Sequence, residues 1–195
     1  MFEAKSMFEI FQKYRGNAIV IPTGTSGKHW RDISSNTKRD AQLGGAMGQT
    51  TSLAFGLALA QPDTKVILFD SEGSLLMNLG ILATIAGKKP QNFYHFLMDN
   101  EVYATTGGQP VPGSKKVNYS GMAKACGYAS GHSFEDLDKF SESVEAILNE
   151  PGPTFVAMKI IPEIENEPIG RRARVPGRSK GQIIKELRED LKVSQ

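Results

Sequence analysis

Residues 66–80 of the chain read VILFDSEGSLLMNLG, an apolar run followed by a short polar turn and then by residues with helical spacing. An apolar run without polar alternation is typical of a strand that is covered on both faces, as in a parallel sheet. The turn places free backbone N–H groups at the start of the next helix, where they favour an anion. This stretch therefore predicts an α/β sheet with a candidate anion site at a strand end.

Three more apolar runs have the same character. They cover residues 18–21, 93–98 and 155–160. Helical spacing is found in residues 49–60, 75–86 and 118–126, and in a segment opened by Ser133 and closed by Pro151. The alternation of strands and helices predicts right-handed crossovers, and hence an α/β three-layer sandwich with a mostly parallel sheet. In such a sheet, ligands bind at the carboxyl ends of the strands.

The first residues predict an amphipathic helix. Ser6 and Glu9 form a capping-box pattern, and the helix should end near Gly16. Its apolar face is made by Met7, Phe8, Phe11 and Tyr14. Charges interrupt this segment throughout, which argues against a signal peptide or a membrane span and favours a cytoplasmic protein.

A second helix is predicted at the C-terminal end. Ser179 and Gln182 repeat the capping-box pattern. The expected docking face is made by Ile183, Ile184, Leu187 and Leu191. We therefore expect a sheet domain at residues 1–162, and an arm with a C-terminal helix at residues 163–195.

Composition limits the classes of function. With 195 residues, of which 39% are hydrophobic, the chain can build one domain with a sizeable core. The net charge of +2 is too small to indicate nucleic acid or an anionic membrane as the main partner. Cys126 is the single cysteine, which excludes an internal disulfide and a multi-cysteine metal site. Its neighbours Ala125 and Gly127 favour a small, buried side chain.

Two loops that follow the first strand are candidates for binding a ligand. In residues 23–26, the side chains of Thr23, Thr25 and Ser26 offer hydroxyls beside a flexible glycine, although an ordinary turn has the same composition.

The second loop, residues 44–48, reads GGAMG. Its glycines allow a ligand to approach the backbone, but their spacing is not that of the dinucleotide fingerprint G-x-G-x-x-G. Met47 is either core filler or a contact to a ligand.

The next two strand ends carry oxygen ligands. Glu72 and Ser74 follow the run at 66–69, and Asn100 follows the run at 93–98. Carboxylate and amide oxygens suit Mg²⁺ or Ca²⁺, so the two loops could hold a cation against a diphosphate. Taken one at a time, such acidic turns are also common helix caps.

Taken together and in order, these segments resemble the diphosphate-binding module of thiamine-diphosphate enzymes. The segments are TGTS at 23–26, GGAMG at 44–48, SEGSLLMNLG at 71–80 and DNEVYATTGGQ at 99–109, supported by AKACGY at 123–128 and PGPTF at 151–155. The usual family pattern is GDG, followed some two dozen or more residues later by NN or DN. The resemblance extends to about Pro162 and is closest to the phosphonopyruvate decarboxylases and the beta subunits of the sulfopyruvate decarboxylases.

The resemblance implies a cation site and a cofactor site. Glu72, Asn100 and the backbone carbonyl of Val102 would bind Mg²⁺, or Ca²⁺ or Mn²⁺ in its place. Contacts to thiamine diphosphate would come from Thr23, Thr25, Ser26, Gly45, Ala46, Met47, Gly73, Ser74 and Tyr103. Among these, Met47 would hold the cofactor bent and Gly73 and Ser74 would contact the diphosphate.

The chain departs from the family pattern at Ser71-Glu72, where the family has Gly-Asp. The change lengthens the ligand arm by one methylene and adds a side chain in the turn. We expect Glu72 to bind the cation all the same. The alternative is a cofactor-free, regulatory relative.

In this family the activating glutamate belongs to a pyrimidine-binding domain. The chain is too short to hold that domain as well, so we assign no catalytic residue to the chain. Residues 1–162 would be the diphosphate-binding domain. A separate subunit would complete a hetero-oligomer, α2β2 or larger.

The resemblance favours decarboxylation of a short acidic 2-oxoacid of the sulfopyruvate or phosphonopyruvate type. An acetolactate-synthase-like carboligation is the alternative enzyme reaction. Candidates for gripping the acidic group are Arg171, Arg172 and Arg174, although an exposed basic surface explains them equally. His29 has a plausible substrate-facing position, whereas His95, within a strand, is expected to be structural.

Overall fold

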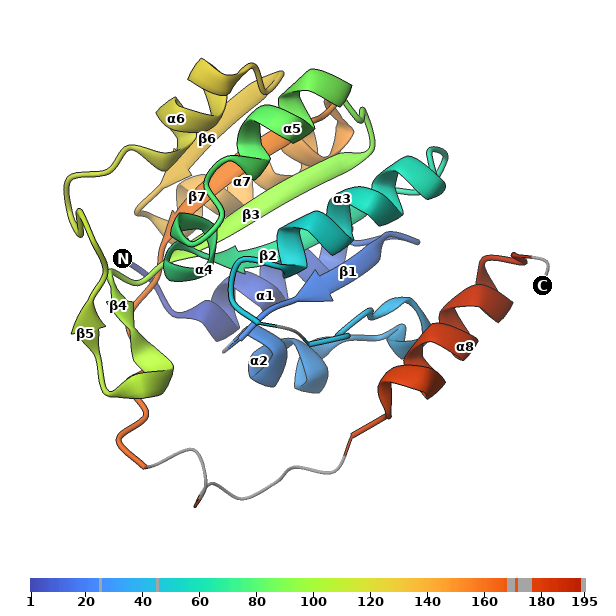
Figure 1. The fold of residues 1–195 in the computed structure, drawn as a ribbon, viewed down its shortest axis with the longest axis horizontal. Helices are drawn as coiled ribbons and strands as arrows, with labels where there is room; N and C mark the ends of the chain where they lie inside the picture. The colour runs from blue at the N-terminus through green and yellow to red at the C-terminus, as the bar shows by residue number, and fades with distance from the viewer. Residues whose placement is uncertain (25, 45, 168–170, 172–176, 194–195) are drawn as a thin grey trace.

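The four apolar runs form four neighbouring strands of one parallel sheet in the computed structural model, which describes residues 1–24, 26–44, 46–167, 171 and 177–193. These strands are β1 (Ile19–Pro22), β2 (Val66–Ser71), β3 (Phe93–Asp99) and β7 (Thr154–Lys159), and β6 (Ser130–Phe134) completes the sheet. The order is β1-β2-β3-β7-β6, and every pair is parallel. The predicted fold class is confirmed (Figure 1).

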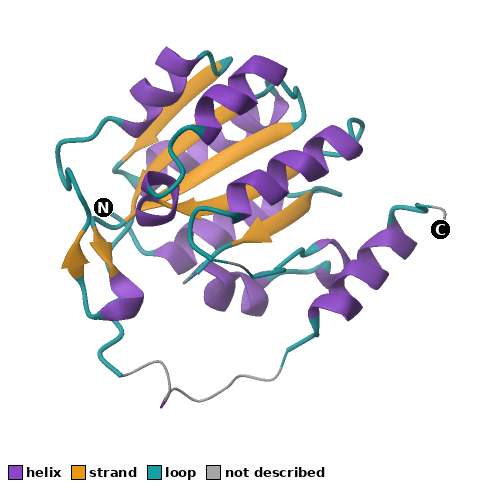
Figure 2. Ribbon diagram, in the orientation of Figure 1, coloured by secondary structure: helices purple, strands orange, loops and turns teal. Residues whose placement is uncertain are grey.

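Helices cover both faces of the sheet (Figure 2). One face carries α1 (Ala4–Tyr14), α2 (Ser26–Ile33) and α7 (Leu137–Asn149). The other carries α3 (Thr50–Ala60), α4 (Glu72–Leu76), α5 (Ile81–Lys88) and α6 (Tyr119–Cys126). The shorter elements are η1 (Thr37–Arg39), η2 (Ala104–Thr106) and the antiparallel hairpin of β4 (Val102–Tyr103) and β5 (Gln109–Pro110), and α8 (Lys180–Asp190) ends the chain.

Two apolar cores explain why the strands lack polar alternation. Along β2, Ile67 and Phe69 point into the core that contains α1 and α7. Val66 and Leu68 point into the core that contains α3 and α5. Because both faces are covered, every position of the run must be apolar.

One strand and one helix escaped the sequence-based expectations. Strand β6 reads SGHSF and lies at the edge of the sheet, where its residues are partly or fully exposed, so no apolar run marks it. Helix α2 begins at Ser26, within the hydroxyl-rich loop that was expected only to bind a ligand.

Three expectations about helix boundaries were wrong. Helix α1 begins at Ala4 without a side-chain cap, so Ser6 does not open it, and Tyr14 is 37% exposed. Ser133 lies in β6, and Asp136 caps α7 instead by accepting hydrogen bonds from two backbone N–H groups. The single helix expected at 75–86 is broken into α4 and α5 by turns at residues 77–80.

Cys126 is exposed, which corrects the expectation that it is buried. It lies in the last turn of α6, beyond Tyr119, Ser120 and Ala123, the buried residues of that helix. Tyr128, two positions later, fills the core in its place.

The C-terminal helix docks as expected. Ser179 caps α8 by accepting a hydrogen bond from the backbone N–H of Gln182, whose side chain bonds to Glu186 instead of returning to the cap. Ile183 and Leu187 are buried, whereas Ile184 is exposed. Within the described residues, no helix is both long enough and apolar enough to span a membrane.

A buried ion pair joins α1 to the chain after β1. The guanidinium of Arg15 donates to Asp40 Oδ1 at 2.8 Å, and Trp30 Nε1 donates to the same oxygen at 2.8 Å. The guanidinium carbon of Arg15 lies 5.2 Å from the centroid of the Trp30 ring. Removing either charge would leave the other buried and unpaired.

Arg15→Met is therefore expected to lower the free energy of unfolding by about 3 to 5 kcal/mol. Urea denaturation followed by the fluorescence of Trp30, the single tryptophan, measures this change. The exposed Arg31→Met is the control and should change stability by less than about 0.5 kcal/mol. A loss below about 1 kcal/mol for Arg15→Met would contradict the assignment of a buried ion pair.

Candidate functional site

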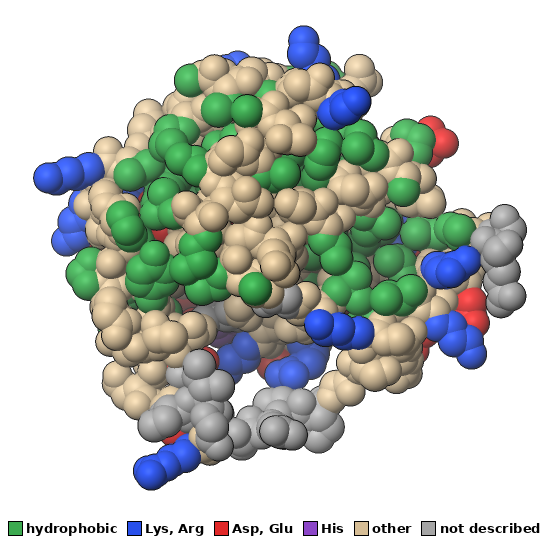
Figure 3. All heavy atoms as spheres, viewed as in Figure 1, with side chains coloured by type: hydrophobic (Ala, Val, Ile, Leu, Met, Phe, Trp, Pro, Cys, Tyr) green, Lys and Arg blue, Asp and Glu red, His purple; other side chains and the backbone are tan. Residues whose placement is uncertain are grey.

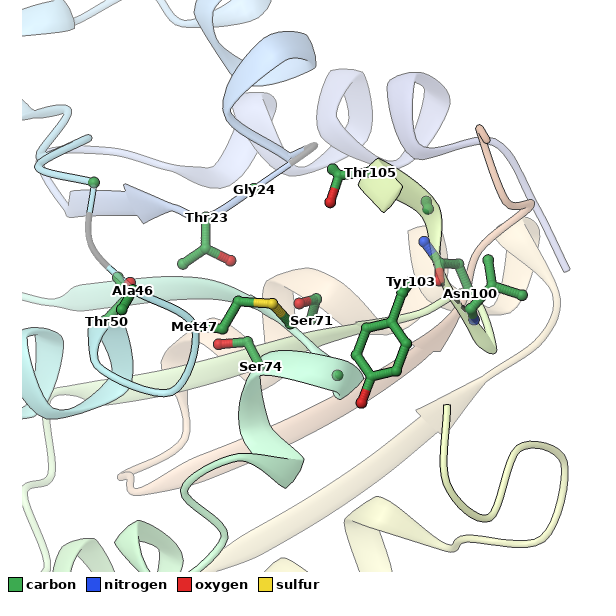
Figure 4. A pocket seen from close by; sticks show the side chains of 14 residues that line it. Thr23, Gly24, Ala46, Met47, Thr50, Ser71, Ser74, Asn100, Tyr103 and Thr105 are labelled. Atoms are coloured by element: carbon green, nitrogen blue, oxygen red, sulfur yellow. Dashed lines mark hydrogen bonds between the residues drawn. The ribbon is translucent and has the colours of Figure 1, made fainter. Parts of the chain in front are cut away.

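The carboxyl ends of β1, β2 and β3 meet at one edge of the sheet. The register pairs Pro22 with Phe69, and Ser71 with Met98, so the loops that follow these strands are neighbours. They surround a cleft together with the loop before α3 (Figure 4). Adjacent strand tips thus bring together residues that are far apart in the sequence.

Most of the expected contact residues line this cleft. They are Thr23, Ala46, Met47, Gly73, Ser74 and Tyr103, with Asn100 and Val102 beside them. Thr25 and Gly45 lie outside the described residues. Ser26 does not line the cleft. Its hydroxyl donates to the Thr23 carbonyl at 2.5 Å and accepts from the Thr23 N–H at 2.8 Å.

Some lining residues were not expected. They are Gly24, Gly44, Thr50, Ser71, Ala104 and Thr105. Gly24, Gly44 and Ser71 lie within the motifs already noted, so those motifs could have identified them. Ala104 and Thr105 follow the expected metal turn in a 3-10 helix and carry no chemical signal of their own.

Gly73 lies beneath two side chains that cover the cleft. A Cβ atom at Gly73 would come within 2.6 Å of Tyr103 Cε1 and 3.4 Å of Met47 Cε. The close approach of Tyr103 therefore requires glycine at this position. Met47 is 45% exposed, so it is not filling the core, and its side chain is available to a ligand.

Hydrogen bonds connect the GGAMG loop to the start of α4. Ser74 Oγ accepts from the Gly48 N–H at 3.0 Å, and Asn78 Nδ2 donates to the Gly48 carbonyl at 2.9 Å. Gly48 has a φ of +83°, which favours glycine. The Ser74 hydroxyl, having accepted one bond, can still donate its proton to an anion.

Glu72 carries a buried carboxylate without a hydrogen-bond partner among the described residues. Glu72 is the first residue of α4 and is 1% exposed, and neither carboxylate oxygen accepts a well-formed hydrogen bond. Burial raises the pKa of Glu72 to about 7, and the charge of Asp99 adds to this rise. The backbone N–H groups of Glu72 and Asn100 oppose the rise only in part. Buried polar groups are nearly always satisfied, so this site calls for a proton or a cation.

The oxygen atoms that could complete a cation site come from the turn after β3. Asn100 Oδ1 accepts from the Val102 N–H at 3.1 Å, which fixes the side chain of Asn100 against its own turn. The Asn100 N–H lies near enough to the Glu72 carboxylate to lower its pKa. One carboxylate, one amide and a backbone carbonyl form a set of hard oxygen donors that suits Mg²⁺.

A second buried polar group lies close to Glu72. The Tyr119 hydroxyl has no hydrogen-bond partner among the described residues. Burial raises its pKa, and the charges of Asp99 and Glu72 raise it further. Glu72 and Tyr119 therefore both carry buried polar atoms that lack a hydrogen-bond partner among the described residues.

Each of the three histidines has a carboxylate neighbour, and that of His132 is Glu150 at 2.6 Å. His95 is fully buried on β3, as expected, and its Nε2 lies 3.3 Å from Asp70 Oδ2. Burial alone would raise the pKa of Asp70, but His95 and a hydrogen bond from Thr51 lower it. His29 lies outside the cleft lining and contacts Glu163 at 2.7 Å.

The arginine cluster is described only in part. Arg171 is exposed, and Arg172 and Arg174 lie outside the described residues.

A protein-family model, described as the thiamine pyrophosphate enzyme C-terminal TPP binding domain, matches residues 23–158. Phosphonopyruvate decarboxylase of Streptomyces viridochromogenes is 38% identical over 140 residues, which cover 71% of this chain and 35% of that protein. The chain thus spans about a third of the length of that relative.

Shorter relatives match over more of their length. Sulfopyruvate decarboxylase subunit beta of Methanococcus maripaludis is 34% identical over 163 residues, which cover 83% of this chain and 86% of that protein. Among solved structures, benzoylformate decarboxylase from Polynucleobacter necessarius superposes with a TM-score of 0.68 at 18% identity, over 83% of this chain and 33% of that chain. At this identity the superposition supports the fold alone.

The raised pKa of Glu72 predicts how stability depends on pH in metal-free buffer. Between pH 4.5 and about 7 the folded protein retains a proton that the unfolded chain has lost, so stability falls as the pH rises through this range. The loss should be on the order of 3 kcal/mol between pH 4.5 and pH 8. Urea denaturation at both pH values, in the presence of a chelator, measures it.

Glu72→Gln is the matched variant, because it removes the titrating group and keeps the shape of the side chain. The stability of Glu72→Gln should lack the fall with rising pH that Glu72 causes. Histidines contribute equally to the unchanged chain and to this variant. Equal slopes for the two proteins would show that Glu72 titrates normally.

Proposed function

The chain belongs to the thiamine pyrophosphate enzymes, as a C-terminal TPP binding domain, and from this premise we propose that it is the diphosphate-binding subunit of a 2-oxoacid decarboxylase. The observation that carries the proposal is the buried, unpartnered carboxylate of Glu72 beside the Asn100 turn. A divalent cation, Mg²⁺ or in its place Ca²⁺ or Mn²⁺, would satisfy this carboxylate and bind a diphosphate at the same time.

The expected ligands divide into those for the cation and those for the diphosphate. Glu72, Asn100 and the carbonyl of Val102 would hold the cation. The N-terminal turn of α4, with Gly73 and Ser74, would offer N–H and hydroxyl donors to the diphosphate. Thr23 lines the cleft, but its hydroxyl donates to the Phe69 carbonyl at 2.9 Å. Thr25 lies outside the described residues and stays an expected contact. The bound cofactor supplies the electron sink for the bond that breaks when carbon dioxide leaves a 2-oxoacid.

The apolar part of the cofactor would lie against the side chains that cover Gly73. Met47 is exposed at the rim of the cleft, and Tyr103 lies beside it over Gly73. The backbone of Gly48 holds the end of the loop that carries Met47 against Ser74 and Asn78. Ala46 lines the cleft as well, and the carbonyl of Gly45, which lies outside the described residues, stays an expected contact.

The departure from Gly-Asp at Ser71-Glu72 is compatible with the turn. Ser71 has φ −118° and ψ 152°, an extended conformation that any residue can adopt. The added side chain therefore causes no backbone strain. The longer arm of Glu72 starts in the first turn of α4, one residue later, and stays buried.

Two features support a partner subunit. The described residues enclose about 160 Å³ at this cleft, whereas sites for small organic molecules usually measure about 300 Å³ or more. The face over α3 and α5 displays hydrophobic and uncharged side chains, with most Lys and Arg at its margins (Figure 3). A subunit that carries the pyrimidine-binding domain would cover this face, supply the activating glutamate and form a hetero-oligomer, α2β2 or larger.

The substrate would be a short acidic 2-oxoacid of the sulfopyruvate or phosphonopyruvate type. The names of the relatives support this class. We propose residues 1–162 as the diphosphate-binding domain and residues 163–195 as an arm that brings Arg171, Arg172 and Arg174 toward the acidic group of the substrate. Guanidinium groups bind sulfonates and phosphonates through paired hydrogen bonds.

Calorimetry with thiamine diphosphate and Mg²⁺ tests the cofactor assignment. Glu72→Ala and Asn100→Ala should each weaken Mg²⁺-dependent binding at least tenfold, because each removes an oxygen ligand. Asn17→Ala, an exposed change before β1, is the control and should bind as the unchanged chain does. If the unchanged chain binds no thiamine diphosphate at millimolar concentration, either alone or mixed with the pyrimidine-binding subunit, the chain is a cofactor-free relative.

Activity measurements test the partner. The chain alone should release no carbon dioxide from sulfopyruvate or phosphonopyruvate, and should do so when mixed with a pyrimidine-binding subunit encoded by a neighbouring reading frame. Met77→Asp, at a side chain 57% exposed on the uncharged face, should weaken assembly tenfold or more. The matched control Tyr14→Asp, at a side chain 37% exposed on α1 behind the sheet, should assemble normally. Full activity of the isolated chain would exclude a required partner.

A further inference from the structure

A lysine from a distant part of the sequence joins two strand tips beside the candidate cation site. Lys159 is the last residue of β7, and the sheet register pairs it with Asp99, the last residue of β3. Its Nζ lies 2.8 Å from Asp99 Oδ2 and 2.9 Å from Glu101 Oε1. One ammonium group therefore holds the residues on both sides of Asn100.

The turn that Lys159 holds has an unfavourable backbone conformation. Glu101 has a φ of +69°, a left-handed conformation that costs a residue other than glycine roughly 1 kcal/mol or more. Such a conformation persists only where its surroundings enforce it. Here the Val111 N–H donates to the Glu101 carbonyl at 3.1 Å, and Lys159 holds the carboxylate of the same residue.

The oxygen atoms of the candidate cation site come from this turn. Asn100 lies between the two carboxylates that Lys159 binds, and Val102 follows them. Asn100 Oδ1 already bonds to the Val102 N–H, so the two residues move together. A shift of Glu101 would therefore displace both expected ligands.

We propose that Lys159 is a positioning residue, which holds residues 99–102 so that Asn100 Oδ1 and the Val102 carbonyl face the cation beside Glu72. This inference rests on the proposed function. Lys115 does not serve the same purpose, because its side chain is largely exposed and its Nζ lies 4.0 Å from Glu101 Oε2.

Simple electrostatics predicts the opposite effect of removing Lys159. The charges around the site are acidic at Glu72, Asp99 and Glu101 and basic at Lys159. Deleting the ammonium would leave an unbalanced negative site that attracts a cation more strongly. Loss of position would weaken binding instead, and residues that orient metal ligands are typically worth 10- to 100-fold in metal affinity. The sign of the change therefore distinguishes the two roles.

The experiment measures Mg²⁺ affinity of the full chain by calorimetry at saturating thiamine diphosphate. Lys159→Met should weaken Mg²⁺ binding at least tenfold, and Lys159→Arg, which can still bind both carboxylates, should restore it to within about threefold. Lys65→Met is the matched control: Lys65 is also half-buried and donates to a backbone carbonyl, but it precedes β2 at the opposite end of the sheet. Its affinity for Mg²⁺ should stay within about twofold of the unchanged chain.

Lys159→Gln provides a second route if Lys159→Met does not fold, because it removes the same charge and keeps a polar group at the strand end. It should weaken Mg²⁺ binding at least tenfold, whereas electrostatics alone predicts tighter binding. Unchanged or tighter Mg²⁺ binding by Lys159→Met, or by Lys159→Gln in its place, would overturn the inference. Failure of the unchanged chain to bind Mg²⁺ and thiamine diphosphate, both alone and with the pyrimidine-binding subunit, would overturn the proposed function itself, so the two failures are distinguishable.

Discussion

A buried carboxylate at the carboxyl end of β2 has no hydrogen-bond partner among the described residues, and the proposed site depends on this carboxylate. Glu72 is buried at the start of α4, where desolvation penalises its charge and no described residue donates a well-formed hydrogen bond to either oxygen. Only a proton or a cation can satisfy it. The backbone of Ser71 is extended, Asn100 is fixed by its own turn, and Lys159 forms ion pairs on either side of Asn100. In the function that we propose, a cation bound to Glu72 would hold the diphosphate at this edge of the sheet.

The sequence was most informative where both faces of an element are buried. Strands β2 and β3 could be predicted because each position along them must be apolar, and their shared edge followed from parallel topology. Prediction failed where burial is partial or local contacts compete. The edge strand β6 has no apolar signal. The turns at 77–80 divide a segment whose apolar spacing is helical, at the point where Asn78 and Gly80 disfavour a helix. Cys126 is exposed, and Tyr128 takes the core position.

The candidate site divides in the same way. Thr23, Met47, Gly73 and Ser74 belong to short motifs at strand ends, so sequence alone pointed to the cleft that they line. The close contact between Gly73 and Tyr103 and the role of Lys159 depend on packing between residues that are distant in the chain. Lys159 is the last residue of a buried strand and has no motif around it. Only the register of β3 and β7 places Lys159 beside Asp99. Such contacts arise from the folded sheet and leave no local pattern.

Anomalous diffraction from crystals grown with Mn²⁺ and thiamine diphosphate would locate the cation. We expect one anomalous peak at the carboxyl ends of β2 and β3, at about 2.0 to 2.2 Å from a carboxylate oxygen of Glu72 and from Asn100 Oδ1, and in contact with the diphosphate. A peak bound by other side chains, or a bound cofactor with Glu72 still unpartnered, would contradict it.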